Sequence, residues 1–181
     1  MRAGSDIDFR LSGAHPRYAR EIEAEFLSLS EQYPMARLRS VSLYEPRGHD
    51  TSMGATLEGG RIVLNAYWFA GDPDRLDDAA KRDVVVEAAG TEIGWHGPMI
   101  REPRQVLHHE FGHCVNQVAP KLIDPWARER WLAATREPIT APSGYALGSA
   151  PEWFAEMFAL CSLGLATQEE HAEMSDLLRK I

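Results

Sequence analysis

The sequence has little of what marks membrane proteins, secreted proteins and nucleic-acid-binding proteins. No apolar run approaches the roughly 20 residues of a membrane-spanning helix. The first ten residues, MRAGSDIDFR, lack the apolar centre of a signal peptide. Basic residues number 19 against 27 acidic ones, and the net charge of −8 disfavours nucleic acid or an anionic membrane as a partner. We therefore expect a soluble protein.

The chain also has too few cysteines for a disulfide framework. Cys114 and Cys161 are its only two, and they fall in separate predicted helices. They lack the CxxC spacing that is typical of metal sites. We expect both to be buried free thiols.

The hydrophobic pattern places strands early in the chain and helices late. Residues 1–181 contain no repeat and no long linker, so we expect a single domain. Apolar periodicity and capping residues predict helices over 16–33, 74–89, 103–119, 124–136, 151–163 and from 168 onward. A strand is expected within 37–45 and a hairpin within 53–69 that turns at 58–61, with loops over 91–100 and 137–150. This order predicts an α+β fold with a small, mostly antiparallel sheet.

Three of the seven histidines fall within six positions of one predicted helix, in VLHHEFGHCVNQ. The stretch from His109 to His113 matches the pattern HExxH. Residues four apart lie one turn apart on the same side of a helix, so both imidazoles can reach one zinc ion at about 2.0–2.1 Å. Glu110 is the general base of this motif and takes a proton from water at the metal. We expect one Zn²⁺ per chain, bound by His109 and His113.

A catalytic zinc ion needs a third protein ligand and keeps its fourth position for water. The extended metzincin motif is excluded, because the chain has Asn116 and Ala119 where that motif needs glycine and histidine. His108 points about 100° away from His109 around the helix, so we expect it to be exposed or to support a ligand. The remaining histidines, none in a suggestive setting, are His15, His49, His96 and His171.

Better candidates are two glutamates in the downstream stretch SGYALGSAPEWFAEMFAL. Glu152 and Glu156 are four apart on a predicted helix that is otherwise strongly apolar. A carboxylate that faces inward on such a helix is costly unless it is paired or binds a metal. For Glu152 an alternative stays open, because Ser149 to Glu152 also fits a capping box.

HEFGH, followed by Tyr145 and seven residues later by EWFAE, resembles the catalytic domain of anthrax lethal factor and the related Pro-Pro endopeptidases. The resemblance covers residues 106–161 and implies a zincin-like fold with an HExxH active-site helix and a C-terminal helical part. It implies that Glu152 is the third zinc ligand and that Glu156 braces a ligand histidine. It also implies that Tyr145 faces the substrate carbonyl oxygen.

Together, the residues and the resemblance predict a zinc-dependent endopeptidase whose partner is a polypeptide substrate. The substrate is expected to lie extended along an edge strand, for which the hairpin strand 61–66 is the candidate. Three alternatives stay open. They are a non-catalytic binding protein stabilised by zinc, a metal hydrolase with a non-peptide substrate, and a metal-free interaction domain with a chance motif.

Overall fold

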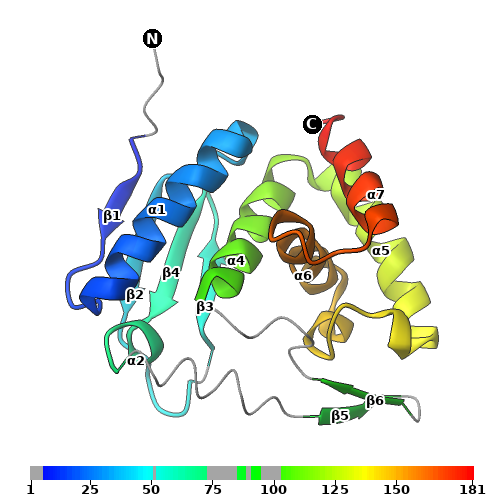
Figure 1. Cartoon of the computed structure of the whole chain (residues 1–181), viewed down its shortest axis with the longest axis horizontal. Helices are drawn as coiled ribbons and strands as arrows, with labels where there is room; N and C mark the ends of the chain where they lie inside the picture. Colours follow the sequence, from blue (N-terminus) through cyan, green and yellow to red (C-terminus); the bar gives the residue numbers. More distant parts are fainter. Residues whose placement is uncertain (1–5, 51, 73–84, 89–90, 95–102) are drawn as a thin grey trace.

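The structure of the chain is a computed structural model that describes residues 6–50, 52–72, 85–88, 91–94 and 103–181. These residues form a mixed α+β fold, with a four-stranded sheet, a two-stranded sheet and six α-helices (Figure 1). The four-stranded sheet belongs to the N-terminal half, and four of the helices follow it in the chain. The α+β prediction is therefore confirmed.

Helix α1 (Pro16–Gln32) begins and ends close to the predicted residues. Its apolar stripe is almost fully buried and consists of Tyr18, Ile22, Phe26 and Leu29. His15 is the residue before the helix, and its ring nitrogen accepts a hydrogen bond from the backbone N–H of Arg17. Pro34 starts a short 3-10 helix (Pro34–Ala36), as expected of a residue that cannot continue α1.

The larger sheet has the strand order β1 (Asp8–Arg10), β2 (Ser40–Tyr44), β4 (Arg61–Asn65) and β3 (Gly54–Leu57). The predicted hairpin is present, because β3 and β4 pair antiparallel. The prediction of a mostly antiparallel sheet is wrong, since β1 pairs parallel with β2 and β2 pairs parallel with β4. For β1 and β2 the physical reason is that α1 lies between them in the chain, and a crossover of that length permits parallel strands; between β2 and β4 the chain returns through β3.

The strand order also corrects the expected position of the edge strand. β4 lies between β2 and β3, so residues 61–65 are interior to the sheet, and Ala66 already belongs to the short helix α2 (Ala66–Phe69). Among the strands that the structure describes, β3 forms the edge next to α4 (Pro103–Val118). A hairpin signal alone does not tell which of its two strands is the outer one.

The helix predicted over 74–89 is wrong at its C-terminal end. Residues 85–88 form strand β5 (Val85–Ala88), which pairs antiparallel with β6 (Thr91–Gly94), in a stretch that was expected to be a loop. Consecutive β-branched valines at 85 and 86 favour a strand over a helix. The rest of these two predicted segments, residues 74–84, 89–90 and 95–100, lies outside the described residues.

The C-terminal half consists mainly of α4, α5 (Pro120–Arg136), α6 (Ala150–Ser162) and α7 (Gln168–Leu178). Helix α5 begins four residues before the predicted start. Pro120 occupies its first turn, where proline is well tolerated, and Pro125, the predicted start, lies inside the helix. The predicted capping box at Thr167 and Glu170 is formed at the start of α7. The loop between α5 and α6 contains two short 3-10 helices, Pro138–Thr140 and Tyr145–Gly148.

Helix α6 packs against both α4 and α5 and is buried along most of its length (Figure 1). The two cysteines lie in α4 and α6 and are buried free thiols, as predicted. Burial raises the pKa of each thiol to about 12, so both remain protonated at neutral pH. In the described part of the chain, no helix combines the length and the apolar character needed to cross a membrane.

Candidate metal centre

The candidate site lies where α4 and α6 pack together. Gly112, inside the HExxH stretch, makes this close packing possible. A Cβ atom at this position would lie 3.0 Å from Cα of Ala155 and 3.2 Å from Cβ of Phe158 on α6. Behind it, Phe111 stacks on Phe158 in the core. The two helices are therefore fixed at a distance that lets the side chains of one reach those of the other.

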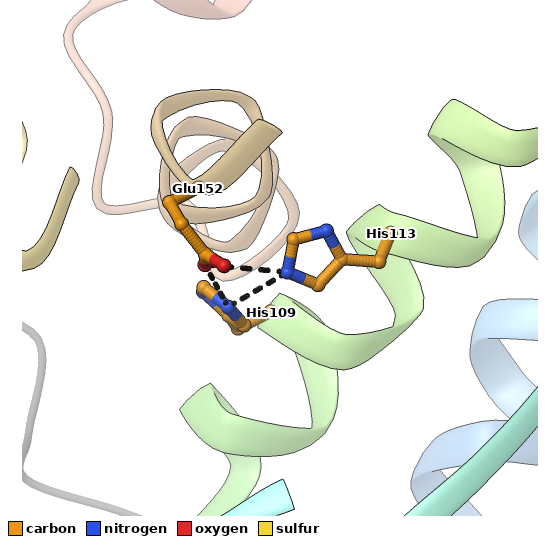
Figure 2. Close-up of side chains that lie close together, drawn as sticks. All are labelled: His109, His113 and Glu152. Carbon is orange, nitrogen blue, oxygen red and sulfur yellow. Dashed lines mark hydrogen bonds and ion pairs between the residues drawn. The ribbon is translucent and has the colours of Figure 1, made fainter. Parts of the chain in front are cut away.

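Three candidate ligand atoms meet in a small triangle (Figure 2). Nε2 of His109 lies 3.1 Å from Nε2 of His113, and Oε2 of Glu152 lies 3.1 Å and 3.3 Å from these two nitrogens. Ligand atoms at about 2.0–2.1 Å from a tetrahedral zinc ion are about 3.3–3.4 Å apart. The spacing of the triangle therefore suits a single zinc ion.

The chemistry of these atoms also suits a cation. Oε2 of Glu152 is a buried carboxylate oxygen that faces the imidazole nitrogens of His109 and His113. Burial alone would lower the pKa of His109, but its contacts with Glu152 and Glu156 outweigh that effect and raise the pKa to about 10. Burial would raise the pKa of Glu152, yet the two histidines lower it. The site thus favours positive charge, which a proton or a metal ion can supply.

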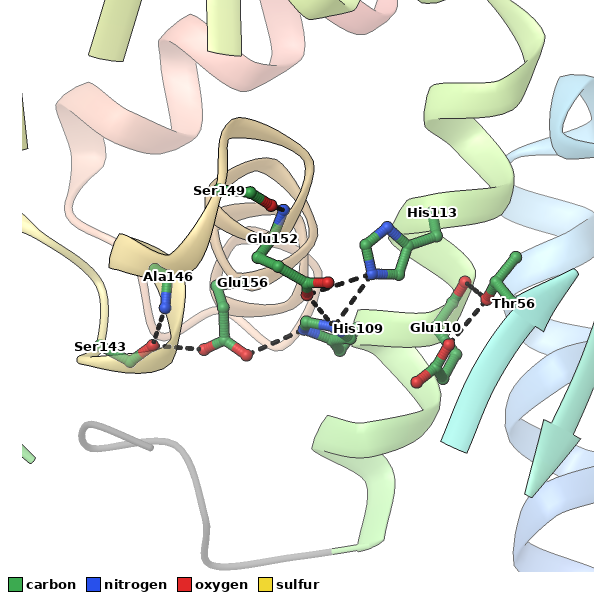
Figure 3. A network of polar contacts seen from close by, with 9 residues as sticks. All are labelled: Thr56, His109, Glu110, His113, Ser143, Ala146, Ser149, Glu152 and Glu156. Atoms are coloured by element: carbon green, nitrogen blue, oxygen red, sulfur yellow. Dashed lines mark hydrogen bonds and ion pairs between the residues drawn. The ribbon is translucent and has the colours of Figure 1, made fainter. Parts of the chain in front are cut away.

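Glu156 orients His109 from the side opposite the triangle (Figure 3). Its Oε1 lies 2.8 Å from Nδ1 of His109, and its Oε2 accepts a hydrogen bond of 3.1 Å from the hydroxyl of Ser143. A proton on Nδ1 that points at Glu156 leaves the lone pair of Nε2 directed toward the triangle. Ser143 is itself fixed, since its hydroxyl accepts a hydrogen bond from the backbone N–H of Ala146.

Glu152 forms only half of the alternative capping box. The hydroxyl of Ser149 accepts a hydrogen bond of 3.4 Å from the backbone N–H of Glu152, as a capping residue does. The Glu152 carboxylate, however, contacts the two histidines of α4. Ser149 therefore caps α6, while the side chain of Glu152 is available as a ligand.

Glu110 and Tyr145 flank the triangle without belonging to it. Glu110 is buried, and the hydroxyl of Thr56 on β3 donates to its carboxylate (Figure 3). The ring of Tyr145 lies 5.7 Å from that of His109. Burial and the charges of Glu152, Glu110 and Glu156 raise the pKa of Tyr145 to about 12, so its hydroxyl is a donor at neutral pH. All six predicted site residues therefore lie in one region: His109, Glu110, His113, Tyr145, Glu152 and Glu156.

The other histidines are not part of this cluster. His108 was expected to be exposed or to support a ligand, and both expectations are wrong. The side chain is buried and bridges α1 and α6, with Nε2 2.6 Å from Glu25 and Nδ1 2.6 Å from the hydroxyl of Ser162. The physical reason is that its side of α4 faces these two helices rather than solvent. His15, His49 and His171 lie outside the cluster, and His96 lies outside the described residues.

Two residues of the site were not predicted from the sequence. Ser143 gave a weak local signal, because a serine hydroxyl often accepts a hydrogen bond from a backbone N–H a few residues later, as that of Ser143 does from Ala146. Thr56 gave none, since its contact with Glu110 joins a strand to a helix far along the chain. No protein-family model, no curated protein and no solved structure matches this chain.

Proposed function

We propose that this chain is a zinc-dependent endopeptidase with a zincin-like fold, similar to the catalytic domain of lethal factor. The observation that carries the proposal is the triangle of His109, His113 and Glu152, whose three ligand atoms lie 3.1–3.3 Å apart. Two imidazoles and one carboxylate are a set that holds catalytic zinc and leaves a fourth position open. A glutamate directly after the first histidine supports hydrolysis rather than a purely structural metal site.

When bound, zinc would polarise the scissile carbonyl and lower the pKa of a water molecule. Glu110 accepts a proton from the attacking water as the new carbon–oxygen bond forms. The same carboxyl group then gives this proton to the amine that leaves as the carbon–nitrogen bond breaks. The hydroxyl of Tyr145 donates a hydrogen bond to the carbonyl oxygen as negative charge develops on it. Glu156 keeps the ring of His109 in one orientation throughout.

The position of β3 supports a peptide as the substrate. Among the described strands β3 is the edge next to α4; its Thr56 contacts Glu110, and a Cβ atom at Gly54 would lie 3.0 Å from the same carboxylate. Among the described strands only β4 pairs with β3, so an extended peptide could pair along the outer side of β3 and thereby lie alongside the base. We therefore propose β3, rather than the interior strand β4, as the strand along which the substrate lies.

A digestion of a proteome-derived peptide library tests the proposal. The library is incubated with zinc-loaded wild type and with Glu110→Gln, and new peptide ends are read by mass spectrometry. Wild type should generate new ends, and Glu110→Gln should generate them about 10²–10⁴-fold more slowly, the range for a lost general base. Equal cleavage by the two proteins, or no cleavage by wild type, would contradict the proposal.

A further inference from the structure

Thr56 contacts the proposed base at two points. Its hydroxyl oxygen lies 2.7 Å from Oε2 of Glu110 and also 2.7 Å from the backbone carbonyl oxygen of Glu110. The hydroxyl carries one proton, which these acceptors share or which goes to one of them, and the thiol of Cys114 is a further hydrogen-bond partner of the same hydroxyl. Hydrogen bonds to an ionised carboxylate are among the stronger ones in proteins. Glu110 is therefore tied to β3 by both its side chain and its main chain.

Gly54 shapes the other side of the same carboxylate. Side chains on a strand alternate between faces, so Gly54 and Thr56 lie on one face of β3. A Cβ atom at Gly54 would lie 3.0 Å from Oε1 of Glu110 and 3.1 Å from its Cγ. The backbone at Gly54 does not have a positive φ, so its conformation does not itself require glycine. The missing side chain instead leaves room for the carboxylate.

From these contacts we infer that Thr56 is a positioning residue that fixes the carboxylate of Glu110 for proton transfer, with Gly54 leaving the space it occupies. The inference rests on the proposed function. A glutamate side chain has several rotatable bonds, and a base must be held close to one geometry in order to act. Threonine suits this task because its branched Cβ restricts the rotation of its hydroxyl.

Because Thr56 lies on β3, its contact with Glu110 also links the base to the strand with which substrate would pair. β3 is also the edge with which an extended substrate would pair, so one strand holds both the base and the substrate. A residue that acts through the base should affect the chemical step more than the binding of substrate. Thr56 should therefore be needed for kcat, while KM and zinc binding should depend on it little.

The test uses zinc-loaded full chain with Thr56→Val, which removes the hydroxyl and keeps the shape, and Thr56→Ser, which keeps the hydroxyl. Thr135→Val removes an exposed hydroxyl of α5 and serves as the matched control. We expect Thr56→Val to lower kcat about 10- to 100-fold, as the loss of a hydrogen bond to a charged group predicts. KM and zinc content should stay near their wild-type values. Thr56→Ser should recover most of the lost rate, and Thr135→Val should change nothing.

A second readout does not depend on activity. In a double-mutant cycle, the loss of melting temperature caused by Thr56→Val should shrink when Glu110 is already replaced by alanine, because the partner carboxylate is then absent. An unchanged kcat in Thr56→Val, a Thr56→Ser variant as slow as Thr56→Val, or equal melting losses in both backgrounds would overturn the inference. If wild type cleaves no peptide, the proposed function fails, and the inference with it. If wild type is active, each of the three results overturns the inference alone.

Discussion

Oε2 of Glu152 lies 3.1 Å from Nε2 of His109, while Oε1 of Glu156, one turn further along α6, lies 2.8 Å from Nδ1 of the same ring. A single imidazole is thus held between two carboxylates of one helix. The two carboxylates face different nitrogens of the ring and should therefore have different roles. In our account, Glu152 shares the metal with His109, and Glu156 sets the direction of the ring.

These roles predict which of two substitutions lowers zinc affinity more. Glu152→Ala should abolish tight zinc binding, because it removes a direct ligand. Glu156→Ala should weaken zinc binding or activity by about 10- to 100-fold, as is typical when the partner of a ligand histidine is lost. Zinc affinity is measured by competition with a chelator, with the exposed Glu169→Ala on α7 as the control. A larger loss in Glu156→Ala than in Glu152→Ala would show that the two roles are reversed.

A second prediction concerns the packing that brings α4 and α6 together. In Gly112→Ala the new methyl group meets the backbone of Ala155, which cannot move aside as a flexible side chain could. The helices should separate slightly, and we expect a loss of about 1–3 kcal/mol in the free energy of unfolding and weaker zinc binding. Urea unfolding and chelator competition measure the two effects.

The control for this variant is Gly148→Ala, because a Cβ atom there meets no atom within 4 Å and Gly148 has no positive φ. It should unfold and bind zinc like wild type. A Gly112→Ala protein that is as stable as Gly148→Ala would contradict the role given to the glycine.

Tyr145 gives a third prediction. Tyr145→Phe keeps the ring beside His109 and removes the hydroxyl. Because the hydroxyl acts on charge that develops in the transition state, kcat should fall by about 10²–10³-fold, while zinc content and melting temperature stay close to wild type. The exposed Tyr67→Phe should cleave peptide normally. Wild-type turnover in Tyr145→Phe would remove this residue from the mechanism.

The sequence predicted those parts of the molecule that depend on local signals. The amphipathic stripe of α1, the hairpin turn between β3 and β4 and the capping box before α7 each lie within a short stretch, and each is present. The meeting of His109 and His113 follows from helix geometry alone. The apolar surroundings of Glu152 and Glu156 marked both as candidate ligands, but the choice of Glu152 as the ligand needed the resemblance to a known family, since no local rule says how α6 packs against α4.

The features that the sequence did not predict depend on contacts between distant segments. The parallel pairing of β1 with β2 and of β2 with β4 is decided by the path of the chain and not by the composition of the strands. His108 is buried because Glu25 and Ser162 reach it from two other helices. The link between Thr56 and Glu110 likewise exists only once β3 lies beside α4.

The central claim is that His109, His113 and Glu152 bind one zinc ion, and the most direct test is the zinc content of chain purified without a histidine tag. Wild type should hold about one zinc per chain after dialysis, and a chelator should lower its melting temperature, since a ligand that binds only the folded state stabilises it. His113→Ala should hold no tightly bound zinc, and the chelator should leave its melting temperature unchanged. Zinc that is absent from wild type, or undiminished in His113→Ala, would contradict the account.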